Sequence, residues 1–399
     1  MSWEMVLLGD VIETLKGYAF KSGHYVESGI PIVRASNFTM DSISDDDLKF
    51  YTEDEATQFR KYELSTDDVL IQTVGSWESN PASVVGKVVR VPQLLDGALL
   101  NQNIVKVFPV DKDQLDLQYL FYRLKCHDFK RHNIGNAVGA ANQASITLDT
   151  IRAFAFLLPN IVEQRRIATI LRGYDDLIEN NQKQIKLLEE AAQRLYKEWF
   201  VDLRFPGHET TSITDGIPEG WKRERLVDIV KVQYGYAFDG SLFNANGNGT
   251  PIVRIRNIPA GTTSDYTTED ADPQYVVYYG DILVGMDGEF HINSWSGPDA
   301  YLVQRTCSFR PNNPNMKGYL LQAIYEPIKY FESTVVGATV AHLGKKHIDT
   351  ITVLTGPDEL YVPFQQYFER RQLLLNQNRL LAEARDRLLP KLMNGEIEV

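Results

Sequence analysis

The four residues GYAF occur twice in this chain, at positions 17–20 and again at 235–238. PIVRASN, which begins at Pro31, is matched in the same way by PIVRIRN, which begins at Pro251. Further matches follow in the same order: DVLIQTVG from Asp68 with DILVGMDG from Asp281, ALLNQ from Ala98 with AYLVQ from Ala300, and two segments that end at Ile151 and Ile351. Matches in one order at similar separations indicate an internal duplication, so the chain must fold as two similar units.

Within each unit, short runs rich in β-branched residues alternate with Gly, Pro, Asn and Asp, which is typical of strands and turns. A helix is expected near residues 115–130, because Leu117, Leu120, Phe121 and Leu124 recur at helical spacing. Each unit is therefore expected to be α+β, with a mixed or mainly antiparallel sheet.

Residues 163–200 contain no proline, and their apolar positions alternate at spacings of four and three, which is the pattern of a coiled-coil seam. The C-terminal stretch repeats this pattern, and the two pseudo-symmetric units are expected to be separated by a pair of long antiparallel coiled-coil helices. The predicted seam residues are Ile167, Leu171, Ile178, Asn181, Ile185, Leu188 and Leu195 in the first helix, and Leu374, Asn378, Leu381, Leu388 and Leu392 in the second. Arg371 and Arg385 also fall in the second seam, where they are expected to reach past the interface to water.

These patterns give five expected segments. They are a first unit at 1–160, a first long helix at 161–202, a linker at 203–220, a second unit at 221–357 and a second long helix at 358–399. Because two similar units are joined by helices that pair antiparallel, one chain is expected to mimic a symmetric dimer. The length of the helices would set the spacing between the units, as a rigid spacer of roughly 50 Å.

Composition narrows the class of protein. The net charge is −12 and no segment forms a basic tail, so DNA binding would depend on local basic loops or on a partner. The two cysteines lie in different halves, which favours a reducing compartment. No signal peptide and no apolar run of membrane-spanning length is recognised, so a cytoplasmic location is expected.

Loop residues that could contact bases or phosphates follow the matched segments in each unit. In the first unit they are Tyr18, Lys21, Arg34, Asn37, Ser76, Ser79, Asn80, Lys87, Asn142 and Gln143. In the second unit they are Tyr236, Arg254, Arg256, Asn257, Glu289, His291, Asn293, His342, Lys345 and Lys346. Each has a simpler alternative: the GYAF segments could be turns with core aromatics, the arginines could form surface ion pairs, and the polar loops could be solvated hairpin tips.

The chain resembles the specificity (S) subunits of type I DNA restriction–modification systems. The resemblance is carried by the two units, by IPEGW at 217–221, by EQRRIATIL and LIENNQKQIKLLEEAAQRLYKEWF in the first helix, and by RDRLLPKLMNGEIEV at the end. It implies two target recognition domains that each read half of a split, asymmetric site on double-stranded DNA. It further implies helices that set the spacer and bind two modification (methyltransferase) subunits, which restriction subunits join.

The same resemblance implies a non-catalytic chain without a cofactor of its own. S-adenosylmethionine would then belong to the modification subunit, and ATP and Mg²⁺ to the restriction subunit. No phosphate-binding loop or adenine-methylating motif is found, and Cys126, His127 and His132 lack two further ligands for a zinc site. A tandem protein- or glycan-binding adaptor held by a coiled coil is the alternative, followed by an enzyme with a carboxylate cluster.

Overall fold

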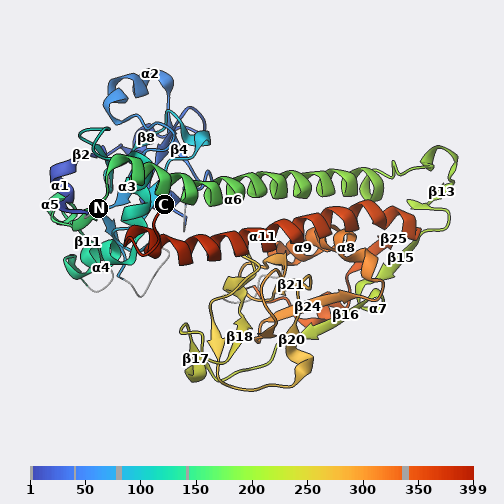
Figure 1. Ribbon diagram of the computed structural model, residues 1–399. Helices are drawn as coiled ribbons and strands as arrows, with labels where there is room; N and C mark the ends of the chain where they lie inside the picture. The colour runs from blue at the N-terminus through green and yellow to red at the C-terminus, as the bar shows by residue number, and fades with distance from the viewer. Residues whose placement is uncertain (1–2, 40–41, 78–82, 141–142, 335–340) are drawn as a thin grey trace. The chain divides into compact units, whose positions relative to one another are not determined.

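The computed structural model describes residues 3–39, 42–77, 83–140, 143–334 and 341–399. The chain divides into two compact units: unit 1 comprises Met1–Asp176 and Ala382–Val399, and unit 2 comprises Leu177–Leu381. Each unit contains a sheet-rich segment and part of each of the two long helices (Figure 1). The expected α+β class is confirmed.

Unit 1 is built on a four-stranded antiparallel sheet with the strand order β2-β9-β5-β7. These strands are Ile12–Lys16, Ile104–Pro109, Val69–Gln72 and Val88–Arg90. A second sheet, β4-β3-β8, pairs β3 with β8 in parallel, which makes the unit mixed. Its strands are Lys49–Tyr51, Ile30–Val33 and Leu99–Leu100.

Two smaller sheets complete unit 1. One pairs β1 (Glu4–Leu7) with β12 (Ala155–Leu158), and the other has the order β10-β11-β6. The strands of the latter are Val138–Ala140, Gln143–Ser145 and Val74–Gly75, and the short helices are α1 (Leu8–Val11), α2 (Glu53–Ala56) and α5 (Leu148–Arg152). The helix expected near residues 115–130 is divided into α3 (Leu117–Lys125) and α4 (His127–Gly135), because Cys126 between them adopts an extended conformation.

Unit 2 repeats this order. Its main antiparallel sheet is β16-β24-β21-β22, formed by Val230–Tyr234, Thr306–Pro311, Ile282–Gly285 and Ile292–Ser294. The second sheet, β17-β19-β18-β23-β20, contains a parallel pair, β18 with β23. Its strands are Phe243–Asn244, Tyr266–Thr267, Thr250–Val253, Ala300–Leu302 and Val276–Val277.

The remaining elements of unit 2 also follow the order of unit 1. β15 (Lys222–Arg225) pairs with β25 (Thr352–Thr355) as β1 pairs with β12. The short helices are α7 (Leu226–Ile229), α8 (Lys317–Ala323), α9 (Tyr325–Thr334) and α10 (Lys345–Ile348). A small hairpin, β13 (Ile213–Thr214) with β14 (Ile217–Pro218), lies in the stretch expected to be a linker.

The structure explains why GYAF occurs twice. The amide of Gly17 donates to the carbonyl of Ile104, and the amide of Gly235 donates to the carbonyl of Thr306, both at 3.0 Å. A Cβ atom at Gly17 would lie 2.0 Å from the carbonyl oxygen of Asn101, and one at Gly235 would lie 2.1 Å from that of Val303. Only glycine permits this close approach of two backbones, so the same requirement appears once in each unit.

The other GYAF residues have the same environment in both units. Tyr18 and Tyr236 are each 36% exposed, whereas Phe20 and Phe238 are buried. The turn-and-core interpretation therefore describes the glycine and the phenylalanine, while the tyrosine lies at the surface.

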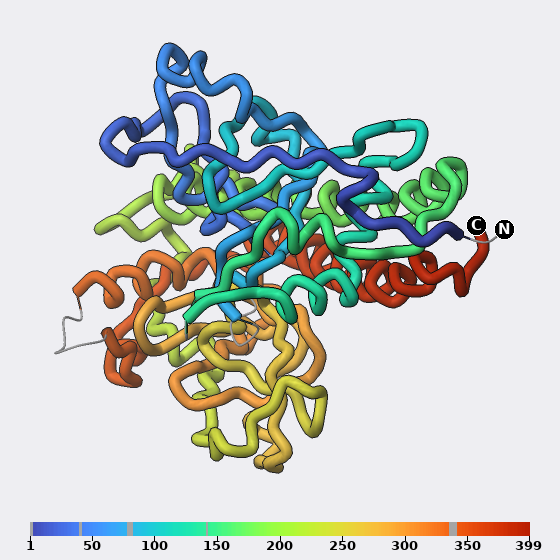
Figure 2. The backbone as a smooth tube through the Cα atoms, turned by 90° about the vertical axis from the view of Figure 1, so that its left-hand side faces the viewer, coloured from blue at the N-terminus to red at the C-terminus, as the bar shows by residue number. Residues whose placement is uncertain are grey.

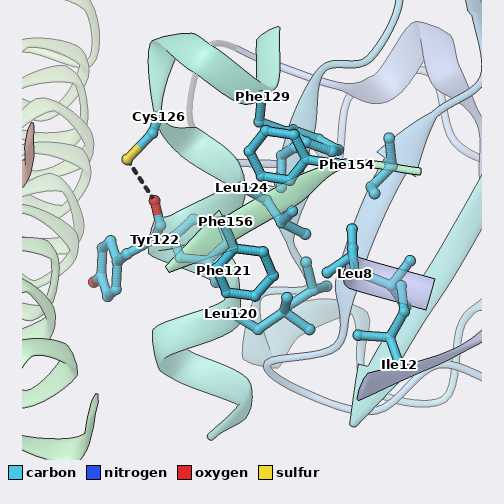
Figure 3. Packing of buried hydrophobic residues seen from close by; sticks show 14 of the residues in the cluster. Leu8, Ile12, Leu120, Phe121, Tyr122, Leu124, Cys126, Phe129, Phe154 and Phe156 are labelled. Atoms are coloured by element: carbon cyan, nitrogen blue, oxygen red, sulfur yellow. Dashed lines mark hydrogen bonds between the residues drawn. The ribbon is translucent and has the colours of Figure 1, made fainter. Parts of the chain in front are cut away.

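The largest core of unit 1 packs the main sheet against α3, α4 and both long helices. Figure 3 shows Phe121, Phe129, Phe154 and Phe156 close together in this core. Ile167 and Leu171 from the first long helix and Leu392 and Met393 from the second belong to the same cluster. The corresponding core of unit 2 is centred on Phe200, Tyr319, Tyr361 and Phe364. The sheet-rich segment of each unit is thus packed onto the helices as well as joined to them by the chain.

The two long helices are α6 (Ile161–Tyr196), which continues through a π-helical turn at Lys197–Val201, and α11 (Val362–Met393). They run side by side and antiparallel within each unit (Figure 1). In unit 2, Asn181 Nδ2 donates to Asn378 Oδ1 at 2.9 Å, and Arg371 Nε donates to Glu189 Oε1 at 2.6 Å. All twelve predicted seam residues are buried or half-buried. Pro390 lies in the last turn of α11, which ends three residues later.

The prediction for Arg371 and Arg385 is wrong, because neither side chain reaches water. Both residues are 8% exposed. Arg371 binds Glu189, and Arg385 Nη1 donates to Asp175 Oδ1 at 2.6 Å. A carboxylate from α6 meets each guanidinium inside the seam, and the local charge balance keeps the arginines buried.

The seam asparagines provide a test of this pairing. Replacing Asn181 alone by leucine is expected to lower the free energy of unfolding by about 1–3 kcal/mol, because the Asn378 amide loses its buried partner. Replacing both asparagines by leucine should be neutral or stabilising, at the expense of a fixed register. Thermal unfolding followed by circular dichroism measures both effects. A double variant less stable than either single variant would contradict the pairing.

The two ends of the chain lie close together in unit 1 (Figure 2). Trp3 Nε1 donates to Glu163 Oε2 at 3.1 Å, and a Cβ atom at Gly395 would contact the Trp3 ring. Arg166 Nη1 also donates to the backbone carbonyl of Val399 at 3.2 Å. The C-terminal residues therefore belong to the fold of unit 1. Within the described ranges, none of the helices is both long and apolar enough to span a membrane.

Candidate nucleic-acid interface

One edge of the main sheet gathers polar side chains in unit 2. β16 and β21 end at this edge, and β24 and β22 begin there, because neighbouring strands are antiparallel. Tyr236 follows β16, and Glu289 and His291 lie in the connection from β21 to β22. His342 reaches the same edge through a backbone bridge to Asp287. We define these connections as the strand-end edge of the unit.

The strand-end edge of unit 2 carries a charged cluster that the sequence did not fully indicate. His342 Nδ1 lies 2.5 Å from Asp287 Oδ1, and Arg305 Nη1 lies 3.3 Å from His342 Nδ1. Of these residues only His342 was selected from the sequence. Arg305 directly follows the matched segment AYLVQ, and that position was the available signal.

Unit 1 has the same edge, formed by the ends of β2 and β5 and the starts of β9 and β7. Tyr18 follows β2, while Ser76 and Lys87 lie in the connection from β5 to β7. Ser76 Oγ lies 2.9 Å from Ser83 Oγ, and Trp77 Nε1 donates to the carbonyl of Ala140 at 3.0 Å. Gln143, on β11, is exposed beside this connection. Ser79, Asn80 and Asn142 lie outside the described residues.

A second group of predicted residues lies in the turns that follow β3 and β18, with equivalent geometry in the two units. Asn37 Oδ1 accepts from the amide of Arg34 at 3.0 Å, and Asn257 Oδ1 accepts from the amide of Arg254 at 2.8 Å. The two asparagines therefore close their turns. Lys21 lies exposed in the neighbouring connection after GYAF.

The arginines of these turns have intramolecular partners. Arg34 Nη2 donates to the backbone carbonyl of Asp47 and lies 3.1 Å from its carboxylate. Arg254 lies over the ring of Phe243, with 5.5 Å between the guanidinium carbon and the ring centroid. Arg256 binds Asp265 through two nitrogens.

The pKa values of the two aspartates reflect these contacts. Burial acts to raise the pKa of Asp265, but hydrogen bonds from Arg256 and Asn257 outweigh it and lower the pKa below its usual value. Hydrogen bonds from Lys49 and then Arg34 lower the pKa of Asp47. Both carboxylates thus remain ionised and hold the basic side chains at the surface of their turns.

Asn293 lies in a different environment from the other predicted contacts. Its Nδ2 donates to the carbonyls of Ile258 and Pro259, and its Oδ1 accepts from Arg371 Nη2 at 2.8 Å. It therefore joins β22 to the helix pair within unit 2. Lys345 and Lys346 are exposed on the first turn of α10.

The described residues contain no group of three or more His, Cys, Asp or Glu side chains placed to hold a metal ion. Cys126 is a buried thiol that donates to the carbonyl of Tyr122 at 3.5 Å (Figure 3). Burial raises the pKa of this thiol to about 11. His132 Nε2 lies 2.8 Å from the carbonyl of Thr150, so its ring nitrogen has a backbone partner.

Comparison with known proteins agrees with this architecture. Residues 1–190 and 218–378 match the family model for the type I restriction modification DNA specificity domain. The chain is 29% identical over 323 residues to the type I restriction enzyme MjaIX specificity subunit of Methanocaldococcus jannaschii, covering 75% of this chain and 73% of that protein. It is 31% identical over 140 residues to the type I restriction enzyme EcoBI specificity subunit of Escherichia coli, covering 35% of this chain and 30% of that protein.

Among solved structures, the S subunit of a type I restriction-modification system from M. genitalium has a similar fold. The TM-score is 0.56 at 16% identity, and the similarity covers 98% of this chain and 96% of that chain. At this identity the similarity establishes the fold.

Proposed function

We propose the following role for this chain, which belongs to the type I restriction modification DNA specificity family: it is the non-catalytic subunit that selects the DNA sequence. Each unit reads one half of a split, asymmetric site. The helix pair determines the number of base pairs between the two halves. The segments that we assign to recognition are 1–160 and 221–357, with helices at 161–202 and 358–399 and a linker at 203–220.

The observation that carries this proposal is that the two units share the topology of the main sheet and carry different side chains at its strand-end edge. Gly17 and Gly235 make the same contacts, and the main sheets have the same strand order. The strand-end edges nevertheless present Ser76 and Lys87 in unit 1, and Glu289 and His291 in unit 2. A common scaffold with different donors and acceptors suits two readers of different base sequences.

The net charge of −12 supports a complex in which other subunits make much of the contact with the DNA phosphates. Phosphate contacts supply most of the affinity of DNA-binding proteins, and an acidic chain with few basic loops provides few of them. We therefore assign much of the phosphate contact to two modification subunits. These would also bind S-adenosylmethionine and methylate adenine, while restriction subunits would supply ATP- and Mg²⁺-dependent steps, all in the cytoplasm.

The long helices offer surfaces for such partners. Val162 and Ile170 are exposed on α6 in unit 1. In unit 2, Leu187 on α6 and Leu373 and Leu380 on α11 are also exposed. We propose that the modification subunits cover these side chains, because burial of exposed apolar surface favours association.

Co-expression with a modification subunit tests the function. The complex is expected to methylate adenine at one split motif, which long-read sequencing of the host DNA detects. Methylation without a sequence motif, or equal methylation when this chain is omitted, would overturn the proposal.

A protein- or glycan-binding adaptor would give no DNA mobility shift in the presence of the modification subunit at a stated salt concentration.

Exchange of one unit tests the assignment of half-sites. Replacing residues 221–350 by the equivalent segment of a relative is expected to change one half of the motif and to leave the other half and the spacer unchanged. The matched control exchanges residues 1–151 and should change the opposite half. A change in both halves, or in neither, would contradict independent reading.

A further inference from the structure

The strand-end edges of the two units can be compared residue by residue, because their backbone hydrogen bonds coincide. The amide of Thr73 donates to the carbonyl of Asn103 at 2.9 Å, and the amide of Met286 donates to that of Arg305 at 2.8 Å. Asn103 and Arg305 also occupy the same place in sequence, one residue after ALLNQ and AYLVQ. They are therefore structurally equivalent.

The neighbours of these two residues are equivalent as well. Val74 in β6 pairs with Ser145 in β11, and Asp287 forms a backbone bridge with His342. The adjoining amides, those of Ile146 and Leu343, donate to the carbonyls of Thr73 and Met286 at 2.9 and 2.8 Å. The sequences therefore differ within one equivalent pattern of backbone hydrogen bonds. Unit 1 places Asn103, Val74 and Ser145 at three positions where unit 2 places Arg305, Asp287 and His342.

Arg305 is held in a defined position although its side chain is 55% exposed. Its Nε lies 3.4 Å from Asp287 Oδ2, and its Nη1 lies 3.5 Å from Asp287 Oδ1. A carboxylate that contacts one side of a guanidinium reduces the rotamer entropy lost on binding and fixes the direction of the remaining donors. In unit 1 the position equivalent to Asp287 is Val74, whose side chain cannot pair with a basic side chain in this way.

The backbone of Arg305 has a φ angle of +68°, in the left-handed region. Side chains other than Gly, Asn and Asp rarely adopt this conformation, and such residues gather at functional sites. Asn103, at the equivalent position of unit 1, is not among the residues with a positive φ angle, so the two units differ here in backbone conformation as well as in side chain. The arginine therefore has a local conformational cost that its packing does not explain, since the side chain is half exposed.

We propose that this position determines specificity in both units: Arg305 reads guanine in the half-site of unit 2, and Asn103 reads adenine in the half-site of unit 1. The assignment rests on the proposed function. Arginine bonds the O6 and N7 acceptors of guanine, and asparagine bonds the N6 donor and N7 acceptor of adenine, in the major groove. Asp287 and His342 are positioning residues for Arg305.

The experiment uses the full chain in complex with its modification subunit and maps methylated adenines by long-read sequencing. The variant Arg305→Asn is expected to reduce the preference for guanine at one position of the unit 2 half-site by about 5- to 150-fold. The reciprocal variant, Asn103→Arg, should lose adenine at one position of the unit 1 half-site. Asparagine tolerates the left-handed backbone, so Arg305→Asn is expected to fold.

Arg225→Asn is the matched control. Arg225 is also an exposed arginine paired with a carboxylate, that of Asp228. It lies before the start of β16, whereas the strand-end edge is formed where β16 ends. This variant should keep the wild-type motif. A further variant, Asp287→Asn, should relax the preference at the same position as Arg305→Asn, with all other positions unchanged.

The outcomes are distinguishable. If the wild-type complex produces a split motif and Arg305→Asn leaves guanine preference unchanged, the proposal for Arg305 is overturned. A uniform loss of methylation over all sequences would also overturn it, since that result describes a phosphate contact. A wild-type complex without any split motif would instead overturn the proposed function itself.

Discussion

Replacing Gly235 by alanine is expected to lower the free energy of unfolding by about 3 kcal/mol or more, the upper range for forcing atoms into a packed site. The added Cβ atom would lie 2.1 Å from the carbonyl oxygen of Val303 and 2.9 Å from that of Leu302. Both oxygens belong to backbone that is fixed by hydrogen bonds. The amide of Gln304 donates to the carbonyl of Tyr236, and the amide of Val303 donates to the carbonyl of Val253. Neither oxygen can rotate away as a flexible side chain could. Urea unfolding followed by far-ultraviolet circular dichroism measures the effect.

Gly240→Ala is the matched control, five residues further along the same chain. A Cβ atom at Gly240 meets nothing within 4 Å, and its φ angle is not positive. Alanine there should be neutral or slightly stabilising, because it reduces the freedom of the unfolded chain. Gly17→Ala should be as harmful as Gly235→Ala, since its Cβ would lie 2.0 Å from the carbonyl oxygen of Asn101. Equal stability for Gly235→Ala and Gly240→Ala would show that GYAF is not repeated for steric reasons.

The features predicted well from the sequence are those encoded by local pattern. The duplication was visible because identical backbone requirements selected the same residues twice, as at Gly17 and Gly235. The antiparallel helix pair was visible because its apolar positions recur at one spacing, and Asn181 does lie against Asn378. Periodicity reports which face of a helix is covered, whatever covers it.

Residues whose role depends on a distant partner were predicted poorly. Arg371 and Arg385 looked like exposed seam residues, because nothing in their own helix shows that Glu189 and Asp175 lie opposite. Asn293 is predicted as a polar loop residue, and the structure places it in β22 with a hydrogen bond from Arg371, while its contact with DNA stays a prediction. Residue type gives the capacity to donate or accept a hydrogen bond, while the partner is set by tertiary structure.

At the strand-end edge, the sequence predicted some of the exposed residues and missed Arg305. Tyr18 and Tyr236 were selected through their motif, and both are exposed at this edge. Arg305 was not selected, because AYLVQ ends one residue before it and the left-handed conformation of its backbone has no sequence signal in an arginine. The comparison of two units within one chain replaces part of the missing information, since it shows where one scaffold carries different side chains.

The buried acid in the seam of unit 1 gives the second large expected effect. Replacing Asp175 by alanine should lower the free energy of unfolding by about 3–5 kcal/mol, as for other buried ion pairs that lose one partner. Asp175 accepts from Arg385 Nη1 and from the hydroxyl of Tyr122, each at 2.6 Å, and Arg90 Nη2 lies 3.6 Å away. Burial first, and then the nearby Asp175 carboxylate, raise the pKa of Tyr122, so its hydroxyl stays protonated and donates. Removal of Asp175 thus takes a hydrogen-bond acceptor from two buried groups, and it also removes an ion-pair partner of Arg90.

Asp176→Ala is the control for loss of an acidic residue from the same helix. Asp176 is exposed and pairs with Arg172 one helical turn away, so its replacement should cost less than about 1 kcal/mol. The double variant Asp175→Ala with Arg385→Ala should cost less than the sum of the two single variants, by at least about 1 kcal/mol, because the second substitution removes a charge that the first left without its seam partner. Additive effects would show that Arg385 does not depend on Asp175, for example because its contact with Asp386 is sufficient.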